Sequence, residues 1–112
     1  MVAMTVLAKA PEARLSPFFT LAPWLRVHDN HSEDFRHIAN QDWTVEHLIE
    51  LICAENPDLL ICGHIPPEAA QTAQRKGIDV RIGPCSVPAT TLIGRAHALP
   101  RPIFRVISDP GT

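Results

Sequence analysis

Two cysteines and one histidine are the residues of this chain whose types and positions best suit chemistry. Cys62 and His64 flank a glycine after the apolar run Leu59–Cys62, and Cys85 follows the apolar run Ile78–Ile82. In open α/β sheets, ligands bind beyond the carboxyl ends of the strands. If the two runs are neighbouring parallel strands, both thiols and the imidazole lie at one sheet edge. Thiolate and imidazole suit zinc, copper and iron–sulfur units, so the sequence predicts a soft-metal site of Cys62, His64 and Cys85.

The segments around these residues favour an anionic ligand. Gly63 lets the backbone approach a ligand closely. Helices that begin at Pro66 and Ser86 would aim the positive ends of their dipoles at the same edge. The second of these helices would also lower the pKa of the Cys85 thiol.

Structural roles stay open for the same side chains. Cys62 ends an apolar run, and a buried free cysteine packs as a small hydrophobic residue. His64 can serve a loop hydrogen bond. Three further histidines, His28, His31 and His37, lie around one turn, but their spacing is not diagnostic of a metal site.

Three strands come first among the elements that must position these residues. A continuous apolar run predicts a buried strand over Val2–Ala8. Alternation predicts a half-exposed strand over Trp24–His28, with Arg26 on its polar side. Phe35–Ala39 then returns as the second strand of a hairpin near one sheet edge.

Helices and strands alternate in the second half of the chain. One helix is predicted from the helical spacing of four apolar residues, Val45, Leu48, Ile49 and Ile52. Its N-terminal cap is expected to be Asp42 or Thr44. It is expected to end at Asn56–Pro57. The remaining expected elements are a strand over Leu59–Cys62, a helix from Pro66–Pro67 to Lys76 with Gly77 just beyond it, a strand over Ile78–Ile82, and a helix capped by Ser86 with Leu92, Ile93 and Ala96 inside. This order predicts an α/β fold with parallel strands and right-handed crossovers.

Composition bounds the class of protein. The chain has 112 residues, of which 46% are hydrophobic, and a formal charge of −2, so one folded domain is expected. Its basic residues are scattered, which disfavours nucleic acid, and no stretch approaches the roughly 20 apolar residues of a membrane helix. Three cysteines cannot all pair within the chain and none forms a Cys-x-x-Cys motif, which favours free thiols in a reducing cytoplasm.

Residues 1–98 are expected to form the α/β domain, and residues 99–112 a proline-rich tail. The tail contains Pro100, Pro102 and Pro110, yet the pattern of 103–107 is typical of a strand. An added edge strand, a partner contact and partial disorder all stay open for it.

Three stretches of the chain resemble motifs of one family. The first, Leu15–Phe19 followed by Ala22–Trp24, is similar to a Ser-Pro-His-Phe-Gly loop and the strand after it. The second, Pro57–Ala70, is similar to a strand, a Gly-x-Ile-Gly-Pro turn and a helix. The third, Lys76–Val80, is similar to the Gly-Ile-x-Val start of a strand. In this order they resemble the dinitrogenase iron–molybdenum cofactor family, the small cofactor-binding and carrier proteins related to NifX and NafY. The resemblance spans residues 4 to 98.

The resemblance implies a ribonuclease-H-like, three-layer α/β/α fold with a mixed five-stranded sheet whose second strand is antiparallel. It also implies a non-enzymatic accessory protein that binds, stores or delivers an iron–sulfur or molybdenum-containing cluster, with a cofactor-biosynthesis protein as partner. The cofactor-binding positions it implies are Ser16, Phe18, Phe19, Gly63 and His64.

Two stretches of the chain depart from the family pattern. Phe18 stands where the family has its histidine and Thr20 where it has the following glycine, while Asn40–Trp43 replaces a glycine-rich segment. Either Cys62, His64 or Cys85 substitutes for the missing ligand, or cluster binding has been lost.

Two other functions compete with cluster binding. A cofactor-free interaction or regulatory module, including a homodimer, would use Phe18, Phe19 and the 103–107 segment as contact surface. A nuclease would need clustered carboxylates to hold two metal ions, and the ends of these strands offer thiols, prolines and histidine instead. No glycine-rich phosphate loop or serine nucleophile motif is present either, so we expect no enzyme.

Overall fold

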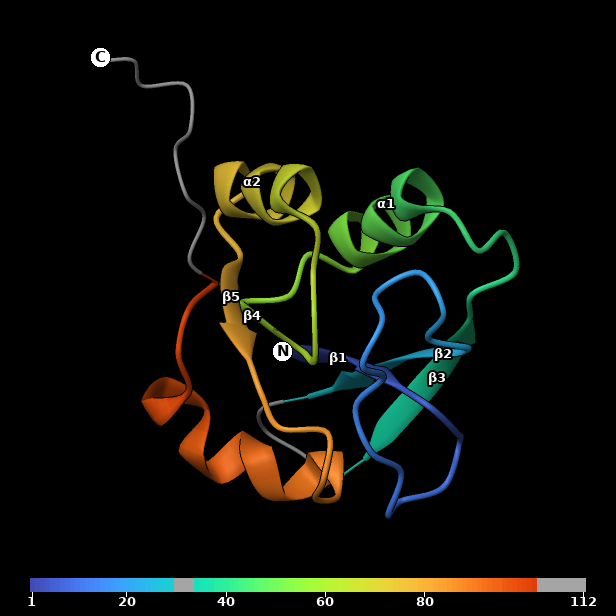
Figure 1. Ribbon diagram of the computed structural model, residues 1–112, viewed down its shortest axis with the longest axis vertical. Helices are drawn as coiled ribbons and strands as arrows, with labels where there is room; N and C mark the ends of the chain where they lie inside the picture. Colours follow the sequence, from blue (N-terminus) through green and yellow to red (C-terminus); the bar gives the residue numbers. More distant parts are fainter. Residues whose placement is uncertain (30–33, 103–112) are drawn as a thin grey trace.

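A five-stranded sheet separates two layers of helix in the computed structural model, which describes residues 1–29 and 34–102 (Figure 1). The strands are β1 (Val2–Val6), β2 (Trp24–His28), β3 (Phe35–Ala39), β4 (Leu59–Cys62) and β5 (Asp79–Ile82). The helices are α1 (Val45–Glu55), α2 (Pro67–Arg75) and the 3₁₀ helix η1 (Ala89–Ala98). In Figure 1, α1 and α2 cover one face of the sheet and η1 lies on the other.

The sheet is mixed and has one reversed strand. Its order is β3-β2-β1-β4-β5, with β2 antiparallel to both β1 and β3, and with β1–β4 and β4–β5 parallel. The predicted mixed five-stranded α/β/α fold with an antiparallel second strand is therefore confirmed. As a consequence, the loops after β1, β3, β4 and β5 leave the sheet on one side, which we call the carboxyl edge.

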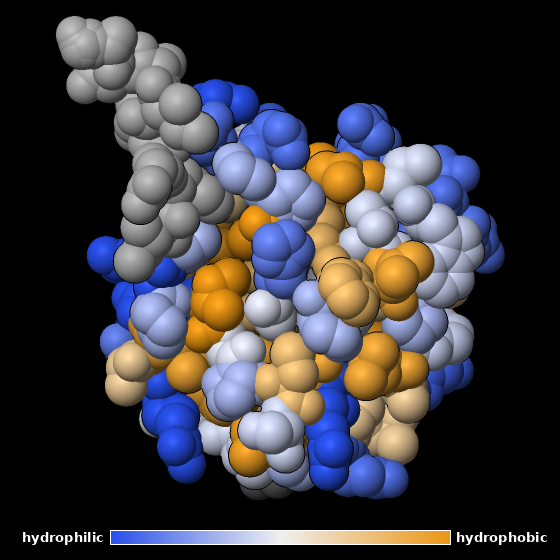
Figure 2. Space-filling model, viewed as in Figure 1, coloured by the Kyte–Doolittle hydropathy of each residue, from blue (hydrophilic) through white to orange (hydrophobic). Residues whose placement is uncertain are grey.

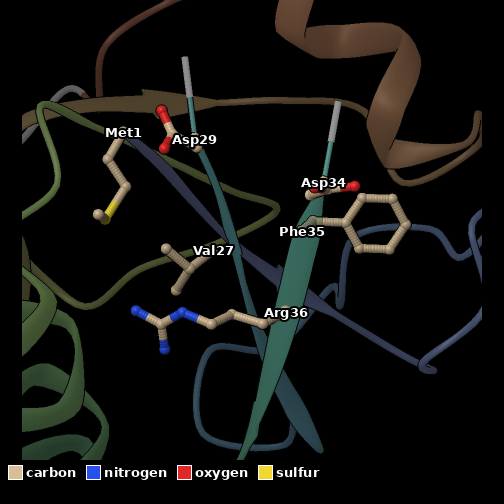
Figure 3. Close-up of a pocket in the computed structure, with 6 residues that line it drawn as sticks. All are labelled: Met1, Val27, Asp29, Asp34, Phe35 and Arg36. Atoms are coloured by element: carbon tan, nitrogen blue, oxygen red, sulfur yellow. The ribbon is translucent and has the colours of Figure 1, made fainter. Parts of the chain in front are cut away.

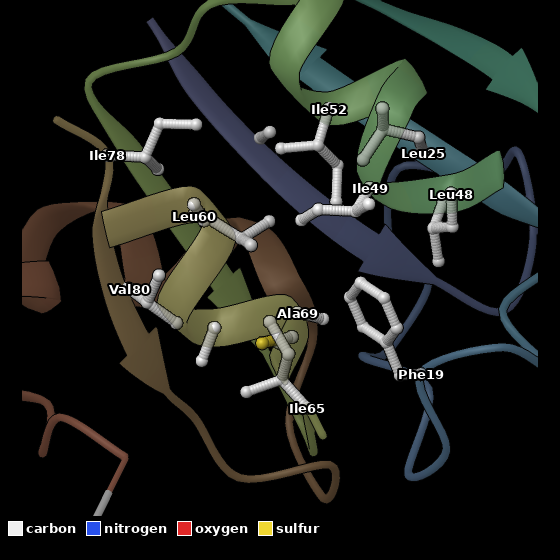
Figure 4. Packing of buried hydrophobic residues seen from close by; sticks show 14 of the residues in the cluster. Phe19, Leu25, Leu48, Ile49, Ile52, Leu60, Ile65, Ala69, Ile78 and Val80 are labelled. Atoms are coloured by element: carbon white, nitrogen blue, oxygen red, sulfur yellow. The ribbon is translucent and has the colours of Figure 1, made fainter. Parts of the chain in front are cut away.

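Two hydrophobic clusters lie on opposite faces of the sheet. Ala3 and Leu60 point toward α1 and α2, whereas Met4 and Ile61 point toward η1. Figure 4 shows the first cluster, in which Leu60 and Ile52 pack between the sheet and the two helices. Helices on both faces explain why β1 and β4 are buried along their whole length and have continuous apolar sequences.

The N-terminus of α1 depends on Thr44. Its side-chain oxygen accepts a hydrogen bond from the backbone N–H of His47 at 3.1 Å, so Thr44 is the cap and Asp42 is not. The helix ends at Asn56, which has a left-handed backbone (φ 51°) just before Pro57. The predicted helix is therefore confirmed, and the structure chooses between its two candidate caps.

The third predicted helix starts later than expected, and its predicted Ser86 cap is wrong. η1 is a 3₁₀ helix that begins at Ala89, with Pro88 at the capping position and no side-chain cap. The backbone N–H of Ala89 donates instead to the carbonyl of Ala13, at 2.8 Å, in the loop after β1. That loop also shortens the first strand, which ends at Val6 because Leu7 N–H turns to the carbonyl of Arg14.

The start of the predicted tail is tied to edge strand β5. The backbone N–H of Ile82 donates to the carbonyl of Pro100 at 2.8 Å, and Arg81 Nη1 donates to the carbonyls of His97 and Leu99. The segment 103–107, predicted to be strand-like, lies outside the described residues.

No helix within residues 1–29 and 34–102 is long and apolar enough to cross a membrane.

Replacing the cap should destabilise the protein. Thr44→Ala removes the side-chain acceptor for His47 N–H, and we expect it to lower the free energy of unfolding by about 1 kcal/mol in urea denaturation. Asp42→Ala is the matched control, because Asp42 only approaches the His47 imidazole at 3.8 Å on an exposed surface. An equal loss in both variants would contradict the assignment of Thr44 as the cap.

Candidate functional site

Three loops of the carboxyl edge meet at Gly63. A Cβ atom added to Gly63 would lie 2.5 Å from Cys85 Sγ and 2.5 Å from the carbonyl oxygen of Ser16. Ser16 comes from the loop after β1, Gly63 from the loop after β4, and Cys85 from the loop after β5. The predicted convergence of these loops is confirmed, and only a residue without a side chain fits where they touch.

Ser16 shapes the first of these loops from within. Its N–H donates to the carbonyl of Thr5 at 2.9 Å, which ties the loop to β1. Its hydroxyl donates to the carbonyl of Phe18 at 2.7 Å and accepts from the Phe18 N–H at 3.3 Å. The hydroxyl is thus used inside the turn, and Ser16 itself is buried.

The two phenylalanines of this loop point to different surroundings. Phe18 is 59% exposed, whereas Phe19 is 2% exposed and packs in the cluster beneath α1 and α2 (Figure 4). Of the predicted binding residues in the loop, Phe18 alone presents its side chain at the surface. Phe19 anchors the loop to the core.

Cys62 is a core residue. Its side chain is fully buried, and its Sγ lies 3.9 Å from the carbonyl oxygen of Arg81. Burial raises the pKa of the Cys62 thiol to about 12, with a smaller contribution from the nearby Cys85 thiol. Cys62 therefore keeps its proton at neutral pH.

Cys85 is half-buried, and burial raises the pKa of its thiol above the usual value. The prediction that a helix start lowers this pKa is wrong. η1 begins only at Ala89, four residues after Cys85, and the Ala89 N–H donates to the carbonyl of Ala13.

His64 projects from the exposed surface next to Gly63. Within residues 1–29 and 34–102, no group of three or more His, Cys, Asp or Glu side chains is arranged to hold a metal ion. Cys62, His64 and Cys85 thus do not fit a preformed three-ligand metal centre, and both thiols are held in their protonated form. Their roles as ligands stay predictions.

An exposed tryptophan at the same edge is a further candidate residue that the sequence patterns did not single out. Trp43 is 48% exposed and has a left-handed backbone with φ 58°, which is rare for a bulky residue. Asn40 connects its loop to the first one by donating from Nδ2 to the carbonyls of Thr20 and Ala22, at 3.1 and 2.9 Å. The available signal was a tryptophan inside the polar run Asn40–Thr44.

Four large apolar side chains in the loops that follow β1 and β3 are exposed, namely Leu7, Phe18, Leu21 and Trp43. We call the last three the apolar rim, because Asn40 connects the loops that carry them. On the face shown in Figure 2, apolar residues are exposed near the middle of the molecule and are surrounded by polar ones. Aromatic residues are enriched at protein–protein interfaces relative to the rest of the protein surface.

A hollow of about 220 Å³ lies away from this edge, at the end of the β2–β3 hairpin (Figure 3). It is lined by Met1, Val27, Asp29, Asp34, Phe35 and Arg36. Because β2 is reversed, this end of the hairpin belongs to the opposite edge of the sheet. His31, one of the three histidines around this turn, lies outside the described residues.

The chain matches one known protein family over most of its length. The model of the family described as "Dinitrogenase iron-molybdenum cofactor" matches residues 1–97. No curated protein matches the chain significantly.

Two similar solved structures share the fold at low sequence identity. One is a Thermotoga protein of the DUF35 family, described as a candidate NifB protein, with a TM-score of 0.72 and 17% identity over 94% of this chain and 97% of that one. The other is the apo form of the orange protein from Desulfovibrio gigas, with a TM-score of 0.79 and 17% identity over 90% of this chain and 91% of that one.

A methyl group at position 63 should push the three loops apart. Gly63→Ala places Cβ against the Ser16 carbonyl, which is backbone and cannot rotate away, and we expect a loss of about 1–3 kcal/mol in unfolding free energy. Gly94→Ala is the control, because nothing lies within 4 Å of a Cβ there. Unchanged stability of Gly63→Ala in urea denaturation would show that the loops are not in contact.

The two thiols should differ in reactivity with iodoacetamide. We expect Cys62 to stay unlabelled in the folded protein and Cys85 to react slowly at pH 7, because the thiolate is the nucleophile and both pKa values are raised. Labelling of Cys85 should speed up by about tenfold per pH unit while the pH stays below its pKa. Mass spectrometry of the labelled peptides measures both rates; rapid labelling of Cys62 in the native state would contradict its burial.

Proposed function

The chain belongs to the dinitrogenase iron–molybdenum cofactor family, and we propose that it is a small accessory protein that binds or carries an iron–sulfur or molybdenum-containing cluster. The single observation that supports this function best is the contact of three loops at Gly63 on the carboxyl edge. In α/β sheets this edge is where ligands bind. In this role the cluster is cargo that the protein takes up and passes on.

We assign the ligand contacts to His64 and Cys85. His64 is exposed beside Gly63, and the Cys85 thiol is half-exposed and touches the same glycine. Cys62 is assigned a supporting role, because a fully buried thiol that keeps its proton cannot reach cargo at the surface. Phe18 offers an apolar contact where the family has a histidine.

Two ligands from one chain suit temporary binding. An iron–sulfur or thiomolybdate unit brings its own sulfide ligands, so a carrier needs to fill only part of its coordination shell. The recipient can then supply the remaining ligands. Because Cys85 must lose its proton to bind a metal, uptake releases a proton and strengthens as the pH rises toward the pKa of Cys85.

The same proposal includes a non-enzymatic role in the cytoplasm. The cysteines at positions 53, 62 and 85 are all free thiols in the structure, as a reducing compartment favours. Within residues 1–29 and 34–102 no cluster of three acidic or other metal-binding side chains is present to support two-metal nuclease chemistry.

A second candidate function is a cofactor-free interaction module, and the apolar rim favours it. Phe18, Leu21 and Trp43 are all about half exposed or more, and the backbone of Trp43 is in a conformation that costs of order 1–3 kcal/mol. Such a cost is retained where a side chain is needed at a surface. The partner would be a cofactor-biosynthesis protein or a second copy of this chain.

Anaerobic reconstitution separates the two functions. We expect the chain, mixed with iron and sulfide or with thiomolybdate and then desalted, to retain a visible absorption band and bound metal. Cys85→Ser and His64→Ala should each lower bound metal by about tenfold or more, because each removes one of two ligands. Cys53→Ser, on α1, is the matched thiol control and should load normally.

Restoring the family histidine gives a test in the opposite direction. Phe18→His should increase the metal retained, because Phe18 is exposed on the loop that touches Gly63. If neither the unaltered chain nor Phe18→His retains metal, cluster binding is refuted. Capture of a biosynthesis protein that Trp43→Ala abolishes would then support the interaction module.

A further inference from the structure

The half of the sheet face formed by β2 and β3 carries a second cluster of charged and aromatic side chains. Arg26 and His37 lie opposite each other on β2 and β3, and Met4 on β1 lies opposite Arg26. Met4 packs with η1, so all three point to the η1 side of the sheet. Trp24 and Phe35 belong to the same side, on the same two strands.

We propose that this surface is an anion site, independent of the proposed cluster site, in which Arg26 and Lys9 hold a tetrahedral oxyanion such as phosphate. Arg26 is the buried charge of this site, Lys9 is the exposed charge, and His37 orients the guanidinium. The anion reaches Arg26 by displacing the Ala10 carbonyl from Nη2.

Arg26 is a buried cation with only neutral partners. Its side chain is 0% exposed, Nε donates to His37 Nε2 at 3.1 Å, and Nη2 donates to the carbonyl of Ala10. Its carbon Cζ lies 4.6 Å from the centroid of the Phe35 ring. Nη1 is buried and has no hydrogen-bond partner among the described residues.

Arg81 shows what a fully satisfied buried arginine looks like in the same chain. It forms two parallel hydrogen bonds of 3.0 Å with the carboxylate of Asp79, and Nη1 donates to the carbonyls of His97 and Leu99. These bonds hold the pKa of Asp79 below its usual value. Arg26 lacks both the carboxylate and the Nη1 partner, although a buried charge is costly unless it is paired.

Lys9 adds a second positive charge above the same strands. Its Nζ lies 5.0 Å from the centroid of the Trp24 ring, on an exposed loop residue. The Trp24 and His37 rings meet edge to face, as do those of Phe35 and His37. The ring contacts and hydrogen bonds of these two cations among the described residues are thus with neutral groups.

The pKa of the His37 imidazole is affected by the positive charges of this surface. Burial and then the charges of Arg26 and Lys9 lower this pKa. Because His37 Nε2 accepts from Arg26, the neutral ring carries its proton on Nδ1 and offers a further donor. The guanidinium of Arg26, the ammonium of Lys9 and the N–H of His37 are all hydrogen-bond donors, and none of them is paired with a carboxylate in the described residues. Such a set suits an oxyanion, because its oxygens accept several hydrogen bonds at once.

Burial lowers the pKa of the Arg26 guanidinium below its usual value, and the nearby carboxylate of Glu12 acts in the opposite direction with a smaller effect. Glu12 is exposed and forms no hydrogen bond with Arg26 in the structure. The loop that contains it is held over Arg26 through the Ala10 carbonyl, so an anion that enters next to Lys9 competes with this single neutral contact.

Titration of the full chain with sodium phosphate, at constant ionic strength set with chloride, tests the proposal by NMR. We expect saturable shifts of the Trp24 indole N–H and a rise in the pKa of His37, because a bound anion offsets the charges of Arg26 and Lys9. The indole N–H of Trp43, in a different loop, should not move. Adenosine 5′-monophosphate is the second probe. If the chain binds it about tenfold more tightly than inorganic phosphate, the ligand is a phosphate ester whose ring stacks on Trp24. If the chain binds both equally, the ligand is the free anion.

The two lysines provide a matched pair of variants. Lys9→Gln should weaken phosphate binding by about tenfold, whereas Lys76→Gln, at the end of α2, should change it less than twofold. Both positions are exposed, so both variants keep the fold.

Equal effects of the two lysine variants, or shifts that chloride reproduces, would overturn the proposal. Binding by Glu12→Gln with none by the unaltered chain would overturn it too, since Glu12 would then be the counter-ion that fills the site. Absence of phosphate binding here would not change the expected metal loading at Cys85 and His64. The two proposals can therefore be refuted independently.

Discussion

The arrangement of the carboxyl edge depends on one glycine that has no side chain. At Gly63, the carbonyl of Ser16 and the sulfur of Cys85 both come within 2.5 Å of where a Cβ atom would stand. The strand order brings the loops after β1, β4 and β5 to this point, and Ser16 fixes the first of them to β1 through Thr5. Around this contact, Phe18 and His64 are exposed, whereas Phe19 is buried in the core.

Charge differs between the two surfaces of interest. At the carboxyl edge both thiols are kept neutral by burial, so a metal must compete with a proton there, and binding is coupled to proton release. On the β2–β3 face, a guanidinium is buried without a carboxylate, so positive charge is already in place before any ligand arrives. The first surface suits reversible uptake of a cluster, and the second suits a small anion.

The sequence allowed prediction of those features that depend on neighbouring residues. Alternation and turn residues gave the bounds of β2 and β3, and a short apolar run before Gly63 gave those of β4. The spacing of Leu48, Ile49 and Ile52 gave α1. Features that depend on distant contacts were missed. Ser86 has the residue type of a cap, but the Ala89 N–H donates to the carbonyl of Ala13, and the helix starts four residues after Cys85. The pattern places Arg26 on the polar side of a half-exposed strand, yet the loop at Ala10 covers it.

The central claim, that cargo binds where the loops meet at Gly63, is tested most directly by mapping backbone amide shifts of the isotope-labelled chain during anaerobic addition of thiomolybdate. We predict that the largest shifts fall on Gly63, His64 and Cys85 and on the loop from Ser16 to Phe19, with little change around Met1 and Asp29 at the opposite edge. Shifts that centre on the opposite edge, or saturation without any change at Gly63 and Cys85, would contradict the account.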